Sequence, residues 1–459
     1  MSGAEFGDAR LSARLGRVVE AVMAAPDQSF PSLFDDSGLE AAYRFFNNDR
    51  VSSEQILAPH AAATVRRMSE QDVSLVVHDT STMSFDPDGA RRGLGRIRST
   101  GQAFFAHVSL ALSGDGGRTP LGVLGLSHHV RRGAPRRRKK VKAKNLVNSE
   151  RARWGRQIKA VTSLGLERAR VVHVMDREAD DYALFAQLVG AGNRFVIRLA
   201  HDRLLETDED NDVRTLAQAV GQIRASAERE VPLSRRPAAG RSPKQRSIHP
   251  AREGRMAKLA FGAARVVLRR PSTQPKTLPA TLSVHVARVW EIEAPAGESP
   301  VEWLLITTEP VETEEEILRI VDWYRARWVI EEFFKVLKTG CAYESRQLET
   351  LEGLLNVLST FLPVAWRMLR MRAQARVAPD ADATTVLPAQ MIAVLRAFTR
   401  IKLPLAPTAR DVFLAVAALG GHLKNNGDPG WLTLRRGYEK LRTLTEGWAA
   451  RKSIVWTDV

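Results

Sequence analysis

The order of strands and helices between residues 72 and 200 constrains the fold of this chain most. Three apolar runs, VSLVVHDTSTMSF, FFAHVSLALSG and PLGVLGLSHHV, have the composition of β-strands, and the turn GDGG separates the second from the third. A helical segment, a strand, a second helical segment and the strand RFVIR follow. Three strands followed by an alternation of helix and strand predict an α/β fold, in which helices flank a mixed sheet.

The other segments predict additions before, within and after this sheet. Residues 1–70 carry apolar residues at helical spacing, with a helix start at Ser52 and Ser53, and predict a helical head. Residues 205–300 alternate like antiparallel strands and predict a β-rich insertion. Beyond residue 345 the chain is mostly helical in pattern. We therefore expect a helical domain at 1–70, a core at 71–370 that contains the insertion, and a helical region at 371–459.

The chain is strongly basic. Its 459 residues carry a formal net charge of +16, with an isoelectric point near 10.3. Such an excess of Lys and Arg favours a polyanionic partner, nucleic acid before an anionic membrane surface. A genome that uses Arg liberally is the alternative explanation. One cysteine, no signal-like apolar segment near the N-terminus and no apolar run of about 18 residues predict a soluble cytoplasmic protein that does not bind membranes.

Three acidic residues occupy positions that suit a metal site. Asp79 ends the first strand, Asp176 ends the fourth, and Glu331 lies on the helix after the insertion. A carboxylate at the end of an apolar strand suits a site at the edge of the sheet better than a core. Three carboxylates can hold two divalent cations for phosphoryl transfer, and oxygen ligands favour Mg²⁺ or Mn²⁺ over zinc. Ordinary turn or capping carboxylates are the alternative for each residue taken singly.

The segment YRARWVIEEFFKVLKTG, which contains Glu331, predicts one long helix. At about 100° per residue, an aromatic residue, three cations and this carboxylate share one face. Arg, Lys and Tyr beside a metal-binding carboxylate suit a phosphate backbone next to a scissile bond. A solvated helix with surface ion pairs is the alternative. The residues of this face are Tyr324, Arg327, Glu331, Lys335 and Lys338.

The spacing Tyr-x2-Arg-x3-Glu-x6-Lys in this helix resembles the signature of the insertion-sequence-four family of bacterial DDE transposases. Other segments of the chain resemble the family in the same order: GDARLSARL, AYRFFNN, HDTSTMSF, DREAD, RFVIR, WLLITTEPVE and GYEKLRTLTEGWAA. The resemblance covers nearly the whole chain. It implies an RNase H-like catalytic core with a mixed five-stranded sheet and the β-rich insertion, between a helical N-terminal DNA-binding domain and a helical C-terminal dimerisation region.

The resemblance also implies roles for individual residues. Asp79, Asp176 and Glu331 match the catalytic triad, which would hold two Mg²⁺ ions, for which Mn²⁺ can substitute. Trp303 matches an aromatic residue that supports a base flipped out of the transposon end, although a tryptophan of the core is the alternative reading of a strand residue. The residues expected to contact DNA are Tyr324, Arg327, Lys338, Lys335, Arg198 and Trp303, with Arg14 and Arg44 in the helical head.

The reaction implied by the resemblance is cut-and-paste transposition. A nick frees a 3′-OH, which attacks the opposite strand to form a hairpin; water reopens the hairpin, and the 3′-OH then attacks target DNA. The expected partners are double-stranded DNA, as transposon ends and target, and a second copy of the chain in a synaptic complex. The expected location is the bacterial cytoplasm, at the nucleoid.

Some segments depart from the family pattern. Residues 131–144 carry nine basic residues and no acidic one, which suits either a solvated loop or phosphate contacts. CAYESRQLE, after the signature helix, matches only in part, and the pair His128–His129 is expected to have a structural or DNA-facing role. A catalytically silent DNA-binding relative and an RNase H-like nuclease without strand transfer are the alternative functions.

Overall fold

The computed structural model describes residues 3–87, 89, 91–97, 101–131, 152–206, 214–237, 250–423 and 427–450. The basic stretch 131–144 therefore lies outside the described residues, apart from Arg131. Two compact units divide the chain: the first comprises Met1–Ser74, Asp79–Lys140 and Trp328–Val459, and the second Leu75–His78 and Val141–Arg327. No helix in the described ranges is both long enough and apolar enough to cross a membrane.

The helices expected near the N-terminus are present in the first unit. Ser52 and Gln55 form a reciprocal capping box at the start of α4, so the helix start predicted there is confirmed. The Phe46 ring stacks on that of Phe30 and meets that of Phe45 edge-on, which joins α2 to α3. These elements are α1 (Ala9–Ala24), α2 (Phe30–Leu33), α3 (Asp36–Phe46) and α4 (Ser53–Ser69).

The first unit also holds the antiparallel strands β2 (Gly95–Ile97), β3 (Gly101–Ser113) and β4 (Pro120–His129), together with most of β1 (Ser74–Phe85). β3 lies between β1 and both β2 and β4. The helix α4 packs on β4, and so does α11 (Leu351–Val377). A buried histidine of α4, His60, accepts a hydrogen bond from the backbone N–H of Val123 in β4 at 3.0 Å.

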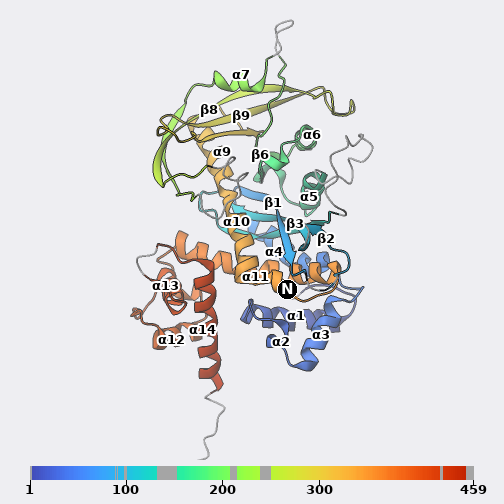
Figure 1. Ribbon diagram of the computed structural model, residues 1–459, viewed down its shortest axis with the longest axis vertical. Coiled ribbons are helices and arrows are strands. Elements are labelled where there is room, and N and C mark those ends of the chain that lie inside the picture. Colours follow the sequence, from blue (N-terminus) through green and yellow to red (C-terminus); the bar gives the residue numbers. More distant parts are fainter. Residues whose placement is uncertain are drawn as a thin grey trace, which may run out of the picture. The chain divides into compact units, whose positions relative to one another are not determined.

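The remaining helices of the first unit follow the signature segment. They include α10 (Trp328–Lys335), the π-helix η5 (Val336–Gly340) and the short η6 (Tyr343–Ser345). After α11 come η7 (Ala383–Thr385), α12 (Ala389–Phe398), α13 (Ala409–Leu419) and α14 (Trp431–Ala450), and the last three pack on one another (Figure 1).

Gly122 lets β4 approach α4 closely. Its φ is +154°, and a Cβ atom there would lie 1.9 Å from Oγ1 of Thr64. We expect Gly122→Ala to lower the free energy of unfolding by about 3 kcal/mol, because the buried Thr64 cannot move away without repacking. Gly116→Ala, at φ +87° with open space around it, is the control and should cost about 1 kcal/mol. Urea unfolding of both variants measures the difference. Equal losses of stability would mean that the Thr64 side chain moves aside at little cost.

The second unit holds a mixed sheet in the order β1-β5-β6-β10-β9-β8-β7, to which β1 contributes Leu75–His78. β5 and β6 are parallel, whereas the strand pairs from β6 to β7 along this order are antiparallel, and β8 and β9 run side by side (Figure 1). These strands are β5 (Val171–Met175), β6 (Arg194–Arg198), β7 (Ala227–Leu233), β8 (Arg255–Arg269), β9 (Thr281–Glu291) and β10 (Glu302–Thr307).

The helices of the second unit are α5 (Arg153–Thr162), η3 (Arg168–Arg170), η4 (Arg177–Ala179), α6 (Tyr182–Gly190), α7 (Leu216–Gly221) and α9 (Glu314–Ala326). Apolar residues of α5, α6 and α7 form one buried cluster against the sheet, and α9 packs on β6, β8 and β9. The α/β class with a large mixed sheet is thus confirmed. The sheet has more strands than the five expected for the catalytic core. β10 pairs with β6, and the strands of the 205–300 segment, expected as an insertion, extend the same sheet beyond β10.

The single helix expected from Tyr324 to Gly340 is not continuous. α9 ends at Ala326, and the backbone N–H of Arg327 turns back to the carbonyl of Tyr324. α10 then gives way to a π-helix at Val336. A π-helix turns more slowly per residue than an α-helix, so the angular positions assumed for Lys338 do not hold. Tyr324 and Arg327 belong to the second unit, and Glu331, Lys335 and Lys338 belong to the first.

Candidate nucleic-acid and metal site

Asp79 lies on β1, where the strand stops being buried. The five residues before it are fully buried, whereas Asp79 and Thr80 are half-buried. The Asp79 carboxylate accepts a hydrogen bond from the backbone N–H of Thr80 at 2.7 Å. The Thr80 hydroxyl in turn lies 2.8 Å from Nδ1 of His107 on β3. The carboxylate is thus held at a defined place on the strand while remaining accessible.

Lys338 is tied to the same strand as Asp79. Its ammonium donates to the carbonyl of Thr82 at 2.5 Å and lies 3.5 Å from a carboxylate oxygen of Glu344. That oxygen also accepts from the backbone N–H of Ser84 at 2.8 Å. Lys338 of the signature segment and Glu344 just after it therefore fix the second half of β1. Lys338 keeps 29% of its side chain exposed, so part of its charge can still meet a phosphate.

Glu331 and Lys335 lie on α10, one turn apart. Glu331 is half-buried and Lys335 is exposed. Asp79, Glu331, Lys335 and Lys338 all belong to the first unit. Four of the residues expected at the site therefore belong to one compact unit.

Asp176 directly follows the fully buried strand β5 in the second unit. Its carboxylate accepts from the backbone N–H of Glu178 at 2.9 Å and caps η4. β5 and β6 are parallel with Met175 opposite Ile197, so Asp176 and Arg198 come at the same end of neighbouring strands. The structure thus places a carboxylate and a cation, both expected from the sequence, at one edge of the sheet.

Arg198 belongs to a cluster with two aromatic side chains. The carbon at the centre of its guanidinium lies 5.8 Å from the centroid of the Trp303 ring, and the Trp303 and Tyr324 ring centroids are also 5.8 Å apart, at 65°. Burial raises the pKa of the Tyr324 phenol, against the opposing charges of Arg198 and Arg327. Trp303 is half-buried, whereas Tyr324 and Arg327 are 4% and 7% exposed. The half-buried Trp303 and Arg198 are therefore the accessible members.

Two buried histidines come shortly before the two aspartates in the sequence. His78, next to Asp79, and His173, on β5, are buried and their rings stack, with Nε2 of His78 2.9 Å from Nδ1 of His173. Burial lowers the pKa of His173 to about 4. His173 is therefore uncharged near pH 7. The pair links β1 to β5 inside the second unit. The sequence analysis did not identify this pair.

Asp180, at the end of the DREAD segment, holds the loop that follows Arg198. Its carboxylate accepts from the backbone N–H groups of Ala200 at 2.6 Å and His201 at 2.8 Å, and it pairs with the guanidinium of Arg203. The Asp180 side chain is fully buried and that of Arg203 is 7% exposed. This network connects the turn after Asp176 to the end of β6, on which Arg198 lies.

We expect Asp180→Ala to lower the free energy of unfolding by about 3–5 kcal/mol, because the change leaves a buried guanidinium and two backbone donors without their acceptor. Urea unfolding followed by circular dichroism measures the loss. Asp181→Ala, which removes the N-cap of α6, is the neighbouring control and should cost about 1 kcal/mol. If the two variants lose similar stability, water replaces the Asp180 carboxylate more easily than its burial indicates.

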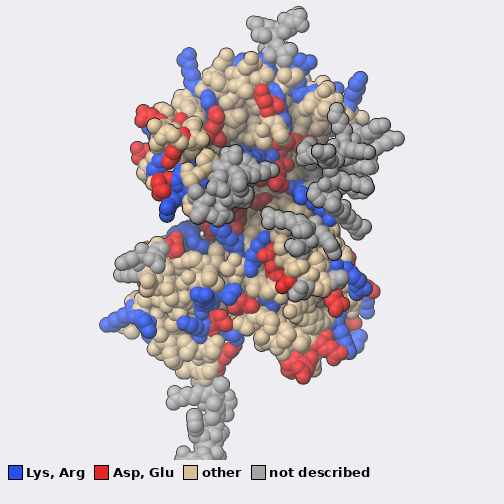
Figure 2. All heavy atoms as spheres, viewed as in Figure 1, with Lys and Arg blue, Asp and Glu red and all other residues tan. Residues whose placement is uncertain are grey.

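The two arginines of the helical head are not part of these clusters. Arg14 is half-buried on α1, and Arg44 is exposed on α3, where it pairs with Glu40 one turn earlier. On the face of the molecule drawn in Figure 2, Lys and Arg are interspersed with Asp and Glu in both units. Among the described residues on this face, the positive charge therefore does not gather in one patch.

The three expected metal ligands have suitable chemistry and exposure. Asp79, Asp176 and Glu331 are each half-buried, so their oxygens can reach an ion, and carboxylate oxygens are the ligands that Mg²⁺ prefers. Within the described ranges, no group of three or more His, Cys, Asp or Glu side chains is arranged to hold a metal ion.

Comparisons with known proteins find transposases. The family model "Transposase DNA-binding" matches residues 1–51, and the family model "Transposase DDE domain" matches residues 142–360. Among solved structures, a piggyBac transposase in a synaptic complex with hairpin DNA is similar at 8% sequence identity and a TM-score of 0.34, over 96% of this chain and 72% of that chain. A likeness that small does not indicate a shared fold. The two family matches, in this order along the chain, support a DDE-type transposase.

Proposed function

We propose that the chain is a cut-and-paste DNA transposase of the insertion-sequence-four family, similar to the Tn-five transposase. It binds the inverted-repeat ends of its element, excises the element through a hairpin intermediate and joins the 3′ ends to target DNA. The observation that carries the proposal is the cluster of Arg198, Trp303 and Tyr324 at the same edge of the sheet as Asp176, inside the segment that matches a transposase DDE domain.

The carboxylates of Asp79, Asp176 and Glu331 are the proposed ligands of two Mg²⁺ ions, which Mn²⁺ can replace. When bound, such a pair of ions lowers the pKa of an attacking water or hydroxyl and stabilises the leaving oxygen. The protein orients two of these carboxylates by backbone hydrogen bonds: Thr80 donates to Asp79, and Glu178 donates to Asp176.

The cationic and aromatic side chains hold the DNA. Arg198, Arg327, Lys335 and Lys338 bind phosphates beside the scissile bond, because guanidinium and ammonium groups form charge-assisted hydrogen bonds with them. Trp303 is half-buried and receives a base that leaves the helix, since stacking on an aromatic ring recovers about 1–3 kcal/mol per base. The buried Tyr324 supports the Trp303 ring from its edge. Arg14 and Arg44 contact the end DNA from the helical head.

The domain roles complete the proposal. Residues 1–70 bind DNA, residues 71–370 form an RNase H-like catalytic core with its β-rich insertion at 205–300, and residues 371–459 hold two copies together in the synaptic complex. The reaction takes place on DNA in the bacterial cytoplasm.

The test uses the purified full chain, Mg²⁺ and a plasmid that carries the gene with its native flanking DNA. Excision with hairpin ends, detected by sequencing the DNA ends and dependent on Mg²⁺, supports the full proposal. Cutting at the flanks without joining to a second plasmid indicates a nuclease. Specific binding to the flanks without any cutting indicates a silent DNA-binding relative.

A further inference from the structure

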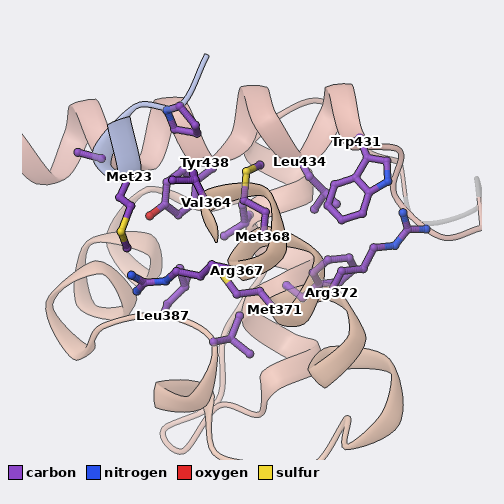
Figure 3. Close-up of a pocket in the computed structure, with 15 residues that line it drawn as sticks. Met23, Val364, Arg367, Met368, Met371, Arg372, Leu387, Trp431, Leu434 and Tyr438 are labelled. Carbon is purple, nitrogen blue, oxygen red and sulfur yellow. The ribbon is translucent and has the colours of Figure 1, made fainter. Parts of the chain in front are cut away.

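A cavity of about 270 Å³ lies among the helices of the first unit. The end of α1, the middle of α11, and residues of α13 and α14 line it, together with Leu387 just before α12 (Figure 3). Most of its wall is apolar, and Met368, Met371 and Phe413 contribute flexible or aromatic surface. Such a wall with a few polar groups at its ends is the usual form of a small-molecule site.

Two hydrogen-bond donors without acceptors mark one end of the cavity. Nε1 of Trp431 and Nε of Arg372 are buried and have no hydrogen-bond partner among the described residues, and Trp431 as a whole is 8% exposed. Figure 3 shows the Trp431 nitrogen and the Arg372 guanidinium at the same end of the cavity, and the centre of that guanidinium lies 4.8 Å from the centroid of the Trp431 ring. A buried donor left without an acceptor is destabilising, so this end is suited to an acceptor.

The charges around this end favour an anion. The carboxylate of Glu332 lies 3.9 Å from a terminal nitrogen of Arg372, at the outer limit of an ion pair. The carboxylate of Asp428 is engaged by Arg410 at 2.9 Å and by Arg376 at 3.9 Å. Three arginines thus face two acidic residues, and the Nε side of Arg372 is left for a further anionic acceptor.

We propose that this cavity binds a small molecule with an apolar body and one carboxylate. The apolar body fills the space between α11 and α13, and the carboxylate accepts hydrogen bonds from Nε1 of Trp431 and Nε of Arg372. A cavity of about 150 Å³ holds benzene, so by proportion this one holds roughly eleven non-hydrogen atoms. A straight-chain carboxylate of eight carbons is close to that size.

The probes are octanoate, 1-octanol and acetate, titrated into the full chain by calorimetry. Octanol has the apolar body without the charge, and acetate has the charge without the body. We expect octanoate to bind about tenfold more tightly than octanol, since hydrogen bonds to a charged group contribute about this factor, and acetate not to bind. Trp431→Phe keeps the ring and removes the N–H, and should reduce the preference for octanoate over octanol about fivefold.

Trp448→Phe is the matched control, because Trp448 lies on the same helix, is 40% exposed and does not line the cavity. It should keep the full preference for octanoate. Equal affinities for octanoate and octanol, or an unchanged preference in Trp431→Phe, overturn the assignment of the carboxylate position. Absence of octanoate binding to the unmutated chain overturns the whole inference, and binding of acetate alone indicates nonspecific attraction to a basic surface.

Discussion

Replacing Glu331 by glutamine is expected to abolish Mg²⁺-dependent cleavage of the element's ends while end binding persists. Glutamine has nearly the same shape but lacks the negative charge that holds a divalent cation. Metal-ion stabilisation of phosphoryl transfer contributes several kcal/mol, and each 1.36 kcal/mol changes a rate tenfold. We therefore expect cleavage to slow by about a thousandfold or more. A gel assay with labelled end DNA measures cleavage, and a mobility-shift assay on the same DNA measures binding.

Glu332→Gln is the matched control for this experiment. Glu332 is the next residue on α10 and also carries a partly exposed carboxylate, but it forms a long ion pair with Arg372, at 3.9 Å. Its replacement should leave cleavage within about twofold, since a partly exposed ion pair contributes little. Equal cleavage by the two variants would remove Glu331 from the site. Loss of DNA binding in Glu331→Gln alone would mean that Glu331 acts through the fold and not through a metal.

Local patterns predicted the elements that carry the candidate ligands. Asp176 directly follows the buried strand β5, so the strand end predicted there is confirmed. Asp79 also follows buried residues, but the prediction that the first strand ends at Asp79 is wrong, because β1 continues through polar residues to Phe85. Ser52 and Gln55, three residues apart, also predict the start of α4. Such features depend on neighbours along the chain, and sequence patterns report those directly.

Long-range pairing was not predictable in the same way. β10 pairs with β6 although about a hundred residues separate them, and nothing in the composition of β10 indicates which edge it joins. The turn at Arg327 is also hidden, because the segment from Tyr324 to Gly340 contains no proline and its only glycine is the last residue. The Asp180–Arg203 pair, buried together, depends on a loop position that spacing alone does not give. Only the folded chain shows these contacts.

Acidification is expected to destabilise the protein well above the pH at which its carboxylates protonate. Burial lowers the pKa of His60 to about 3 and that of His173 to about 4. Nε2 of His60 accepts a hydrogen bond from the backbone N–H of Val123. Protonation of His60 would place an N–H of the ring opposite this backbone N–H and break the hydrogen bond. An unfolded chain takes up a proton at each histidine near pH 6.5, whereas the folded chain does not until the pH reaches the lowered values.

The stability carried by these neutral histidines is therefore complete above pH 6.5 and falls as the pH drops below it. Each group contributes up to about 1.36 kcal/mol per pH unit, with half that slope at pH 6.5, so between pH 6.5 and 5 the two together remove about 3 kcal/mol, a large share of a typical stability of about 5–15 kcal/mol. Urea midpoints at pH 7.5, 6.5, 5.75 and 5 measure the slope of stability against pH.

His60→Gln should roughly halve this slope, because the glutamine carbonyl can accept a hydrogen bond from Val123 without titrating. His201→Gln, at an exposed histidine, should leave it unchanged. A flat profile over this range, or a full slope in His60→Gln, would show that water or local opening reaches these buried rings and that the neutral histidines do not set the acid limit of the fold.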